Sequence, residues 1–139
     1  MKALTLLIYL IIPFSLYSQS DLDKIVKEAE KNICDCTKKT FIKNGVDVIK
    51  LEQITNIYKK TNNIPNNEIP TVNKLYKQIN SNISNISAGI NSCREKFIEN
   101  PKYKPYFNDQ LFTNKLQKAL DFNNYYYGPI IIRKLAIKK

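Results

Sequence analysis

Apolar positions recur at steps of three and four along most of the chain beyond residue 19, which is the spacing of one face of an α-helix. The first such stripe follows Ser20, whose side chain suits the N-cap position. It stops before Asn44-Gly45, two residues that tolerate a left-handed helix end. This spacing predicts a helix from Ser20 to about Lys43. The stripe consists of Leu22, Ile25, Val26, Ala29, Ile33, Cys36 and Thr40.

The middle of the chain repeats the helical pattern on both sides of a loop. A less regular stripe predicts a helix over residues 47–60, and four Asn and two Pro within residues 61–70 predict the loop. Helical spacing then continues from Thr71 until Asn100-Pro101, which predicts one long central helix. Its stripe consists of Val72, Leu75, Tyr76, Ile79, Ile83, Ile86, Ile90, Cys93 and Phe97.

The C-terminal residues predict shorter elements. A helix is expected over residues 109–121 and a turn over residues 123–129, whereas the pattern of residues 130–139 fits a short helix or a strand equally well. Together the elements predict an all-α fold. We expect a single helical domain over residues 19–139, built as a small bundle of about four helices with one long central helix.

Residues 1–18 follow a different pattern. Lys2 is their one charged residue, an apolar stretch of 15 residues that includes a proline runs from Ala3 to Tyr17, and the small residue Ser18 comes next. This is the order of a secretory signal peptide, and the stretch is shorter than the roughly 20 residues that span a bilayer. We therefore expect residues 1–18 to be a cleaved signal peptide rather than a membrane anchor, and the protein to be periplasmic or secreted.

The charge of the chain is strongly basic, with 22 Lys and Arg against 12 Asp and Glu. Residues 101–139 hold eight of the basic residues and only two of the acidic ones. We expect this C-terminal third to bind an anionic envelope polymer or lipid headgroups, and export argues against nucleic acid as a partner. The alternative is that these side chains only keep the bundle soluble. The anion-binding candidates are Lys102, Lys104, Lys115, Lys118, Arg133, Lys134, Lys138 and Lys139.

Three cysteines, Cys34, Cys36 and Cys93, form the most distinctive chemical set in the sequence. Exported proteins commonly pair their cysteines. Residues two apart on a helix point about 200° apart, so Cys34 and Cys36 cannot bond to each other while the first helix is intact. Cys36 and Cys93 both fall on apolar stripes, which favours a Cys36–Cys93 disulfide over a Cys34–Cys93 disulfide. Cys34 is then left as a free thiol or as the link of a disulfide-bonded dimer.

The amino-acid composition excludes several catalytic mechanisms. The chain has no His, which excludes Ser-His-Asp and Cys-His nucleophile systems and His-based zinc sites. Its three Gly are too far apart in sequence to form a phosphate-binding loop. We therefore expect a non-enzymatic helical binding or interaction protein without metal or cofactor, whose partner is an anionic envelope component or an unidentified protein. The alternative is a thiol-active protein, redox or metal-handling, that uses Cys34 and Cys36.

Overall fold

Six α-helices build the computed structural model, which describes residues 19–137 without the side chain of residue 137. Every regular element among these residues is helical, which confirms the all-α prediction. The expected signal peptide, residues 1–18, and the anion-binding candidates Lys138 and Lys139 lie outside the described residues. The elements are α1 (Gln19–Lys43), α2 (Val48–Thr61), η1 (Asn66–Glu68), α3 (Ile69–Ser81), α4 (Ile83–Glu99), η2 (Lys104–Tyr106), α5 (Gln110–Asp121) and α6 (Asn124–Ile137), where η marks a 3-10 turn.

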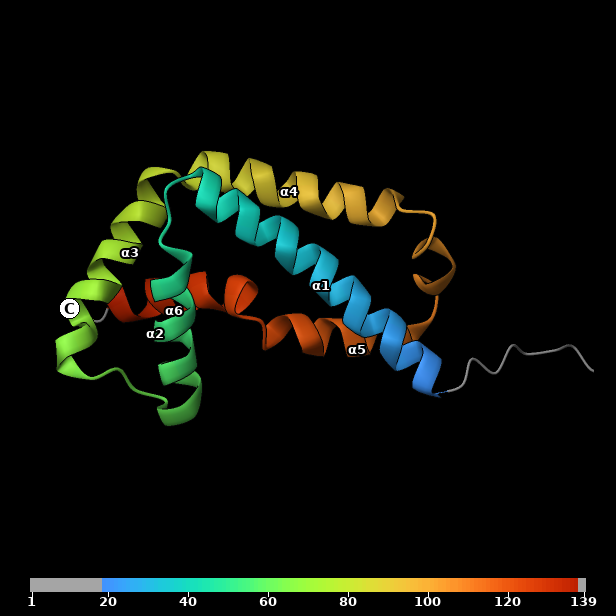
Figure 1. The fold of residues 1–139 in the computed structure, drawn as a ribbon, viewed down its shortest axis with the longest axis horizontal. Coiled ribbons are helices and arrows are strands. Elements are labelled where there is room, and N and C mark those ends of the chain that lie inside the picture. The colour runs from blue at the N-terminus through green and yellow to red at the C-terminus, as the bar shows by residue number, and fades with distance from the viewer. Residues whose placement is uncertain (1–18, 138–139) are drawn as a thin grey trace, which may run out of the picture.

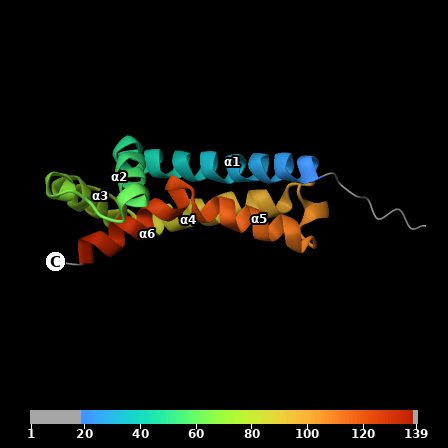
Figure 2. The same ribbon diagram turned by 90° about the horizontal axis from the view of Figure 1, so that it is seen from below.

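The helices form two groups along an elongated molecule (Figure 1). In one group α4 and α5 pack on α1, and in the other α2 and α3 pack on α6. Contacts between α1 and α6 join the two groups. Figure 2 shows α1 along one side of the molecule, with α4, α5 and α6 on the other. α1 begins at one end of the molecule and α6 finishes at the opposite end, as Figure 1 shows.

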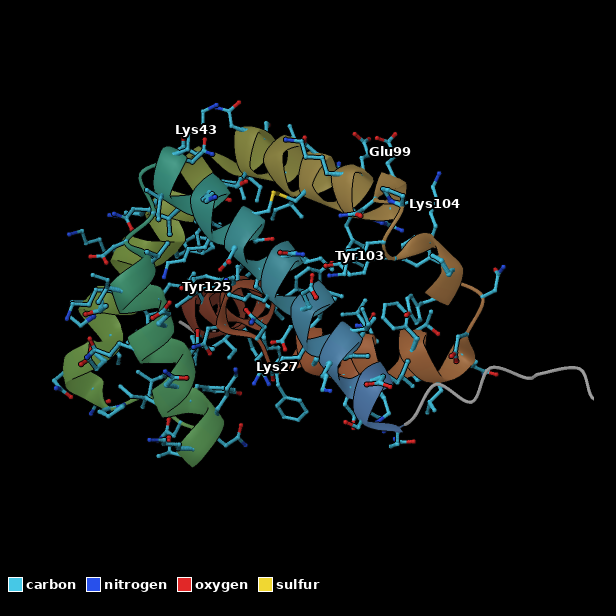
Figure 3. All side chains as sticks on the ribbon, turned by 45° about the vertical axis from the view of Figure 1, so that its right-hand side comes forward. Lys27, Lys43, Glu99, Tyr103, Lys104 and Tyr125 are labelled. Carbon is cyan, nitrogen blue, oxygen red and sulfur yellow. A yellow bond between two sulfur atoms is a disulfide. The ribbon has the colours of Figure 1, made fainter. Side chains whose placement is uncertain are left out.

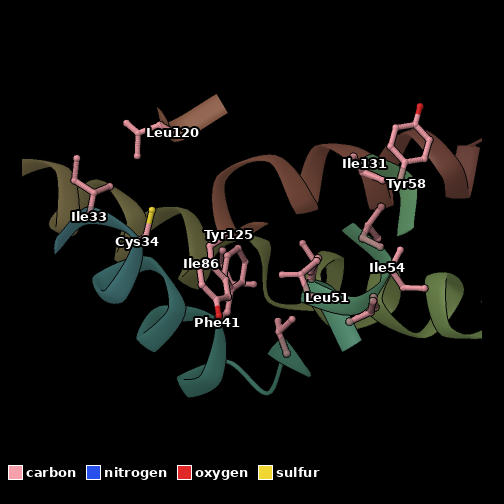
Figure 4. Close-up of a cluster of buried hydrophobic side chains, with 14 of the residues drawn as sticks. Ile33, Cys34, Phe41, Leu51, Ile54, Tyr58, Ile86, Leu120, Tyr125 and Ile131 are labelled. Atoms are coloured by element: carbon pink, nitrogen blue, oxygen red, sulfur yellow. The ribbon is translucent and has the colours of Figure 1, made fainter. Parts of the chain in front are cut away.

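One cluster of buried apolar side chains runs through both groups (Figure 4). Phe41 of α1, Leu51 and Ile54 of α2 and Phe112 of α5 have no exposed surface, and Ile131 of α6 is almost fully buried. The helices α2, α3, α5 and α6 have 12 to 14 residues, a length at which an isolated helix is marginal in water. Burial of these side chains, rather than helix propensity, therefore holds the elements in place.

The prediction of one long central helix is wrong, because the chain leaves the helix at Asn82 and divides it into α3 and α4. The backbone of Asn82 has φ −120° and ψ 18°. Its side-chain amide donates to the carbonyl of Gln78 at 3.3 Å, and the Ser81 hydroxyl donates to the carbonyl of Lys77 at 2.7 Å. Side chains of Asn and Ser compete in this way with backbone hydrogen bonds. Continuous apolar spacing therefore does not require a continuous helix.

The expected number of helices is also too low, because the C-terminal residues are helical as well. Residues 124–129, expected as part of a turn, begin α6, and residues 130–137 continue it, so the strand alternative is wrong. Gly128 lets α6 lie directly on α2. A Cβ atom at this position would come within 2.7 Å of Thr55 Oγ1 and 3.0 Å of Leu51 Cδ1. Packing between helices here overrides the local signal for a turn.

Candidate functional site

A disulfide joins α1 to α4. The sulfur atoms of Cys36 and Cys93 are bonded, with 5.8 Å between the Cα atoms, and the sulfur bond is visible between the two helices in Figure 3. This is the pairing that the apolar stripes favour. The expected stripe of α1 is nevertheless wrong beyond Ile33, because the buried face continues through Cys34, Thr37 and Phe41. Cys36 lies at the edge of that face, where α4 packs.

The two helices remain close one turn beyond the disulfide. Thr40 follows Cys36 on α1, and Gly89 precedes Cys93 on α4. The Thr40 hydroxyl donates to the carbonyl of Cys36 at 3.2 Å and lies 3.8 Å from the Cys93 Sγ. A side chain at position 89 would overlap with Thr40. The disulfide and Gly89 therefore set the distance between α1 and α4.

An open groove of about 880 Å³ follows this contact between α1 and α4. The groove is lined by Lys39 and Lys43 of α1 and by Lys96 of α4, and no carboxylate of the described residues lines it. On the α4 side the lining extends from Asn82 to Lys96, which is about 21 Å at roughly 1.5 Å per residue. We call this site the lysine groove. Its uncharged polar lining residues are Thr40, Asn44, Asn82, Asn85 and Ser92.

The three lysines of the groove make no side-chain ion pair or hydrogen bond with any described residue. Other lysines of α1 do: Lys31 lies 2.5 Å from Asp35, and Lys38 lies 3.3 Å from Glu52. The hydrogen bond from Lys31 lowers the pKa of the Asp35 carboxyl, and the charges of Lys39 and Lys38 lower it further. The groove thus has unpaired ammonium groups on both walls, which give it a positive potential.

Two candidates from the C-terminal third attach later parts of the chain to α1. Lys102 lies 2.5 Å from Glu28, and Lys115 of α5 lies 2.6 Å from Asp23. The hydrogen bond from Lys102 is the main reason that the pKa of the Glu28 carboxyl is lowered. Both lysines therefore have an acidic partner within the chain, unlike those of the lysine groove.

The other described candidates are spread over the molecule. Lys134 of α6 lies 3.2 Å from the Tyr58 hydroxyl, with its ammonium group over the ring. Lys104, Lys118 and Arg133 are exposed and have no side-chain partner among residues 19–137. Lys104 lies at the η2 end (Figure 3), whereas α6 finishes at the opposite end of the molecule. The structure therefore does not bring these candidates together on one patch.

Cys34 is the free cysteine of the described residues, and it is buried. Burial, followed by the charges of Glu30 and Asp35, raises the pKa of its thiol to about 12. The thiolate is the reactive form, so this thiol suits neither exchange chemistry nor a bridge to another chain in the folded state. Cys36 is already bonded to Cys93, and residues 19–137 contain no group of three His, Cys, Asp or Glu that could hold a metal.

Sequence reasoning missed the lysine groove because it added charges along the chain, and residues 19–60 are nearly neutral. A usable signal was present in the spacing. Lys39 and Lys43 follow Cys36 by one and two helical turns, and Lys96 follows Cys93 by one turn. Each lysine therefore lies on the same helix face as a bonded cysteine, and the disulfide brings the two faces together.

The chain matches no protein-family model, no curated protein and no solved structure. Among residues 19–137, no helix is both long enough and apolar enough to cross a membrane. The geometry of the described residues therefore carries the functional proposal.

Proposed function

We propose that this protein is an exported, non-enzymatic helical binding protein that holds a linear anionic envelope polymer in the lysine groove. One observation carries the proposal: Lys39, Lys43 and Lys96 line the same groove, and among the described residues they have no ion-pair partner and no carboxylate lines the groove. None of the three lysines has an ion-pair partner among the described residues, so an anion that enters the groove supplies one.

The shape of the groove favours a linear polyanion over a single ion or a flat membrane. Lys43 and Lys96 stand toward opposite ends of its length of about 21 Å, which suits a ligand with repeated anionic groups. The ammonium group is a point charge without a preferred plane, so lysines recognise charge density rather than one fixed anion geometry. A flexible chain reaches the floor between two helices, whereas a planar layer of headgroups contacts only the rims.

Export is supported by two independent features. Residues 1–18 have the order of a signal peptide, and the Cys36–Cys93 disulfide is of a kind that persists in oxidising compartments and is rare in the cytosol. The ligand class therefore comprises polymers outside the cytoplasm that carry phosphate, sulfate or carboxylate groups. Mass spectrometry of the exported protein is expected to find Gln19 at its N-terminus.

The chemistry of the remaining groups supports binding rather than catalysis. The chain has no His, and the Cys34 thiol is buried with a raised pKa. Asp23, Glu28 and Asp35 each accept from a lysine at 2.6 Å or less. Groups held in this way stabilise contacts between and along helices and are not poised to exchange protons with a substrate.

The experiment compares the binding of polyphosphate of medium length to variants in which three lysines are replaced by the uncharged residue Gln. In the groove variant, Lys39, Lys43 and Lys96 are all replaced by Gln. If each lost contact is worth about 0.5 kcal/mol, the three together weaken binding by roughly tenfold. Wild-type affinity should also fall as salt shortens the Debye length toward about 8 Å.

A matched control carries the same loss of charge elsewhere. This control replaces Lys60, Lys74 and Lys77 by Gln. These three lysines are exposed, have no side-chain partner among the described residues and lie outside the groove. The control variant is expected to keep most of the wild-type affinity for polyphosphate. A third variant replaces Lys104, Lys118 and Lys134. If only this third variant loses binding, the site is the basic C-terminal third. If wild type binds anionic vesicles but not polyphosphate, the ligand class is wrong.

A further inference from the structure

An apolar cleft of about 460 Å³ lies between α3 and α6, beside the start of α4. Its volume falls within the range of roughly 300–1,000 Å³ that is typical of small-molecule sites. None of its lining residues belongs to the lysine groove. The apolar lining consists of Tyr76, Ile79, Ile83, Pro129, Ile130 and Ile132.

The floor and the rim of this cleft differ in exposure. Ile79 and Ile132 are 8% and 1% exposed, whereas Ile83 and Ile130 are 49% and 60% exposed. Two large apolar side chains therefore remain in water beside an apolar floor. A ligand with an apolar body removes this surface from water when it enters the cleft, which favours binding.

Among the described residues that line the cleft, Arg133 is the one charged residue, and Asn80 contributes a side-chain amide. The Arg133 side chain has no ion pair or hydrogen bond with any described residue. Only Arg94 and Arg133 among the 22 basic residues are arginines. A guanidinium is less strongly hydrated than an ammonium and binds a carboxylate through two parallel hydrogen bonds, so it suits an anion at the edge of an apolar site.

We propose that this cleft binds a single-chain fatty carboxylate, with the alkyl chain along the four isoleucines and the carboxylate on Arg133. The positive charge of Arg133 favours an anionic head group, because it would repel a cationic one and a neutral one would leave the guanidinium without an ionic partner. Size decides the tail, because a cleft toward the smaller end of the range for ligand sites suits one alkyl chain rather than two.

The test follows the isoleucine methyl signals of the purified exported protein by NMR during titration with dodecanoate below its micelle concentration. The signals of Ile79, Ile83, Ile130 and Ile132 are expected to shift and saturate. Those of Ile90 and Ile98, which line a different cleft, are expected to stay in place. Dodecyltrimethylammonium, with the same tail and the opposite charge, is expected to produce weaker shifts at the four cleft isoleucines.

Variants separate recognition of the head group from a general effect of charge. Arg133→Gln is expected to weaken dodecanoate binding by at least about tenfold, because one hydrogen bond between charged groups already accounts for that factor and the guanidinium makes two. Lys74→Gln removes an exposed cation of α3 that does not line the cleft, and it should leave the affinity unchanged. Four outcomes would each overturn the proposal. Dodecanoate could produce no saturable shift, or it could shift only the signals of Ile90 and Ile98. Dodecyltrimethylammonium could bind as tightly as dodecanoate, or Arg133→Gln and Lys74→Gln could lose the same affinity.

Discussion

The side chain of Thr40 on α1 occupies the space that a Cβ atom on Gly89 of α4 would need. Such an atom would lie 3.0 Å from the Thr40 Oγ1 and 3.3 Å from its Cβ, with the Cγ2 closer still. This pair is one helical turn from the Cys36–Cys93 disulfide, so two adjacent contacts hold α1 against α4. The narrow floor of the lysine groove depends on both.

Replacement of Gly89 by Ala is expected to lower the free energy of unfolding by about 1 kcal/mol. Overpacking costs roughly 1–3 kcal/mol, and the higher helix propensity of Ala regains about 0.5–1 kcal/mol. Urea unfolding measures the difference. In a Thr40→Ser background, which lacks the Cγ2 but keeps the hydroxyl, the same replacement should destabilise the protein less, because the closest of the three contacts is gone. A Gly89→Ala protein more stable than wild type would contradict the close approach.

Removal of the disulfide is expected to lower stability by about 4 kcal/mol, because the bridge closes a loop across 57 positions. The measurement is urea unfolding of a Cys36→Ser/Cys93→Ser protein against wild type. Cys34→Ala, which keeps the bridge, serves as the control and should lose much less. An unfolding midpoint that does not respond to loss of the bridge would show that α1 and α4 are not linked.

The buried Cys34 thiol predicts a loss of stability at high pH. Its pKa is about 12 in the folded protein against an ordinary value of 9.0, so between these values the unfolded chain releases a proton that the folded chain keeps. The stability that this thiol confers is complete below about pH 9 and falls as pH rises through the folded pKa. The difference in unfolding free energy between wild type and Cys34→Ala should therefore shrink over this range.

A thiol reagent provides the second readout for Cys34. Native protein at neutral pH is expected to leave this buried thiol unmodified, and denatured, unreduced protein should show one reactive thiol. Rapid modification of the native protein, together with a constant free-energy difference across the pH range, would indicate an accessible thiolate and favour the thiol-active alternative.

Two buried tyrosines give opposite predictions for loss of the hydroxyl. The Tyr103 hydroxyl accepts from the Asn32 side-chain amide and lies 3.4 Å from Glu28 Oε1, to which it donates. The Tyr125 hydroxyl is buried and has no hydrogen-bond partner among the described residues. Tyr103→Phe should lower the free energy of unfolding by about 1–2 kcal/mol, and Tyr125→Phe should leave it unchanged or raise it by up to about 1 kcal/mol. Equal losses in thermal unfolding would refute this contrast.

The sequence predicts the helices well where local signals and packing agree. Gly45 ends α1 with φ +72°, and the side chain of Asp109 accepts from the backbone N–H groups of Leu111 and Phe112 at the start of α5. The sequence prediction fails where local signals and tertiary packing conflict. At Asn82, side-chain hydrogen bonds interrupt an unbroken apolar stripe. At Gly128, close packing on α2 turns an expected turn into helix.

The candidate site is less predictable than the fold, because it depends on which side chains become neighbours. The basic C-terminal third is evident in the sequence, yet Lys102 and Lys115 find carboxylates on α1, a helix distant in sequence. Lys43 and Lys96 come from segments of low net charge and line one groove because α1 and α4 pack together at the disulfide. The sequence prediction already favours the Cys36–Cys93 disulfide, but it does not combine this pairing with the positions of the lysines on the two bridged helices.

Backbone amide NMR during titration with polyphosphate tests the central claim most directly, because it locates the bound anion without a substitution. We predict saturable, salt-sensitive shifts over residues 36–44 of α1 and the following turn and over residues 82–96 of α4, the two walls of the lysine groove. Shifts confined to residues 102–118 and 130–137 would contradict the claim and assign anion binding to the basic C-terminal third.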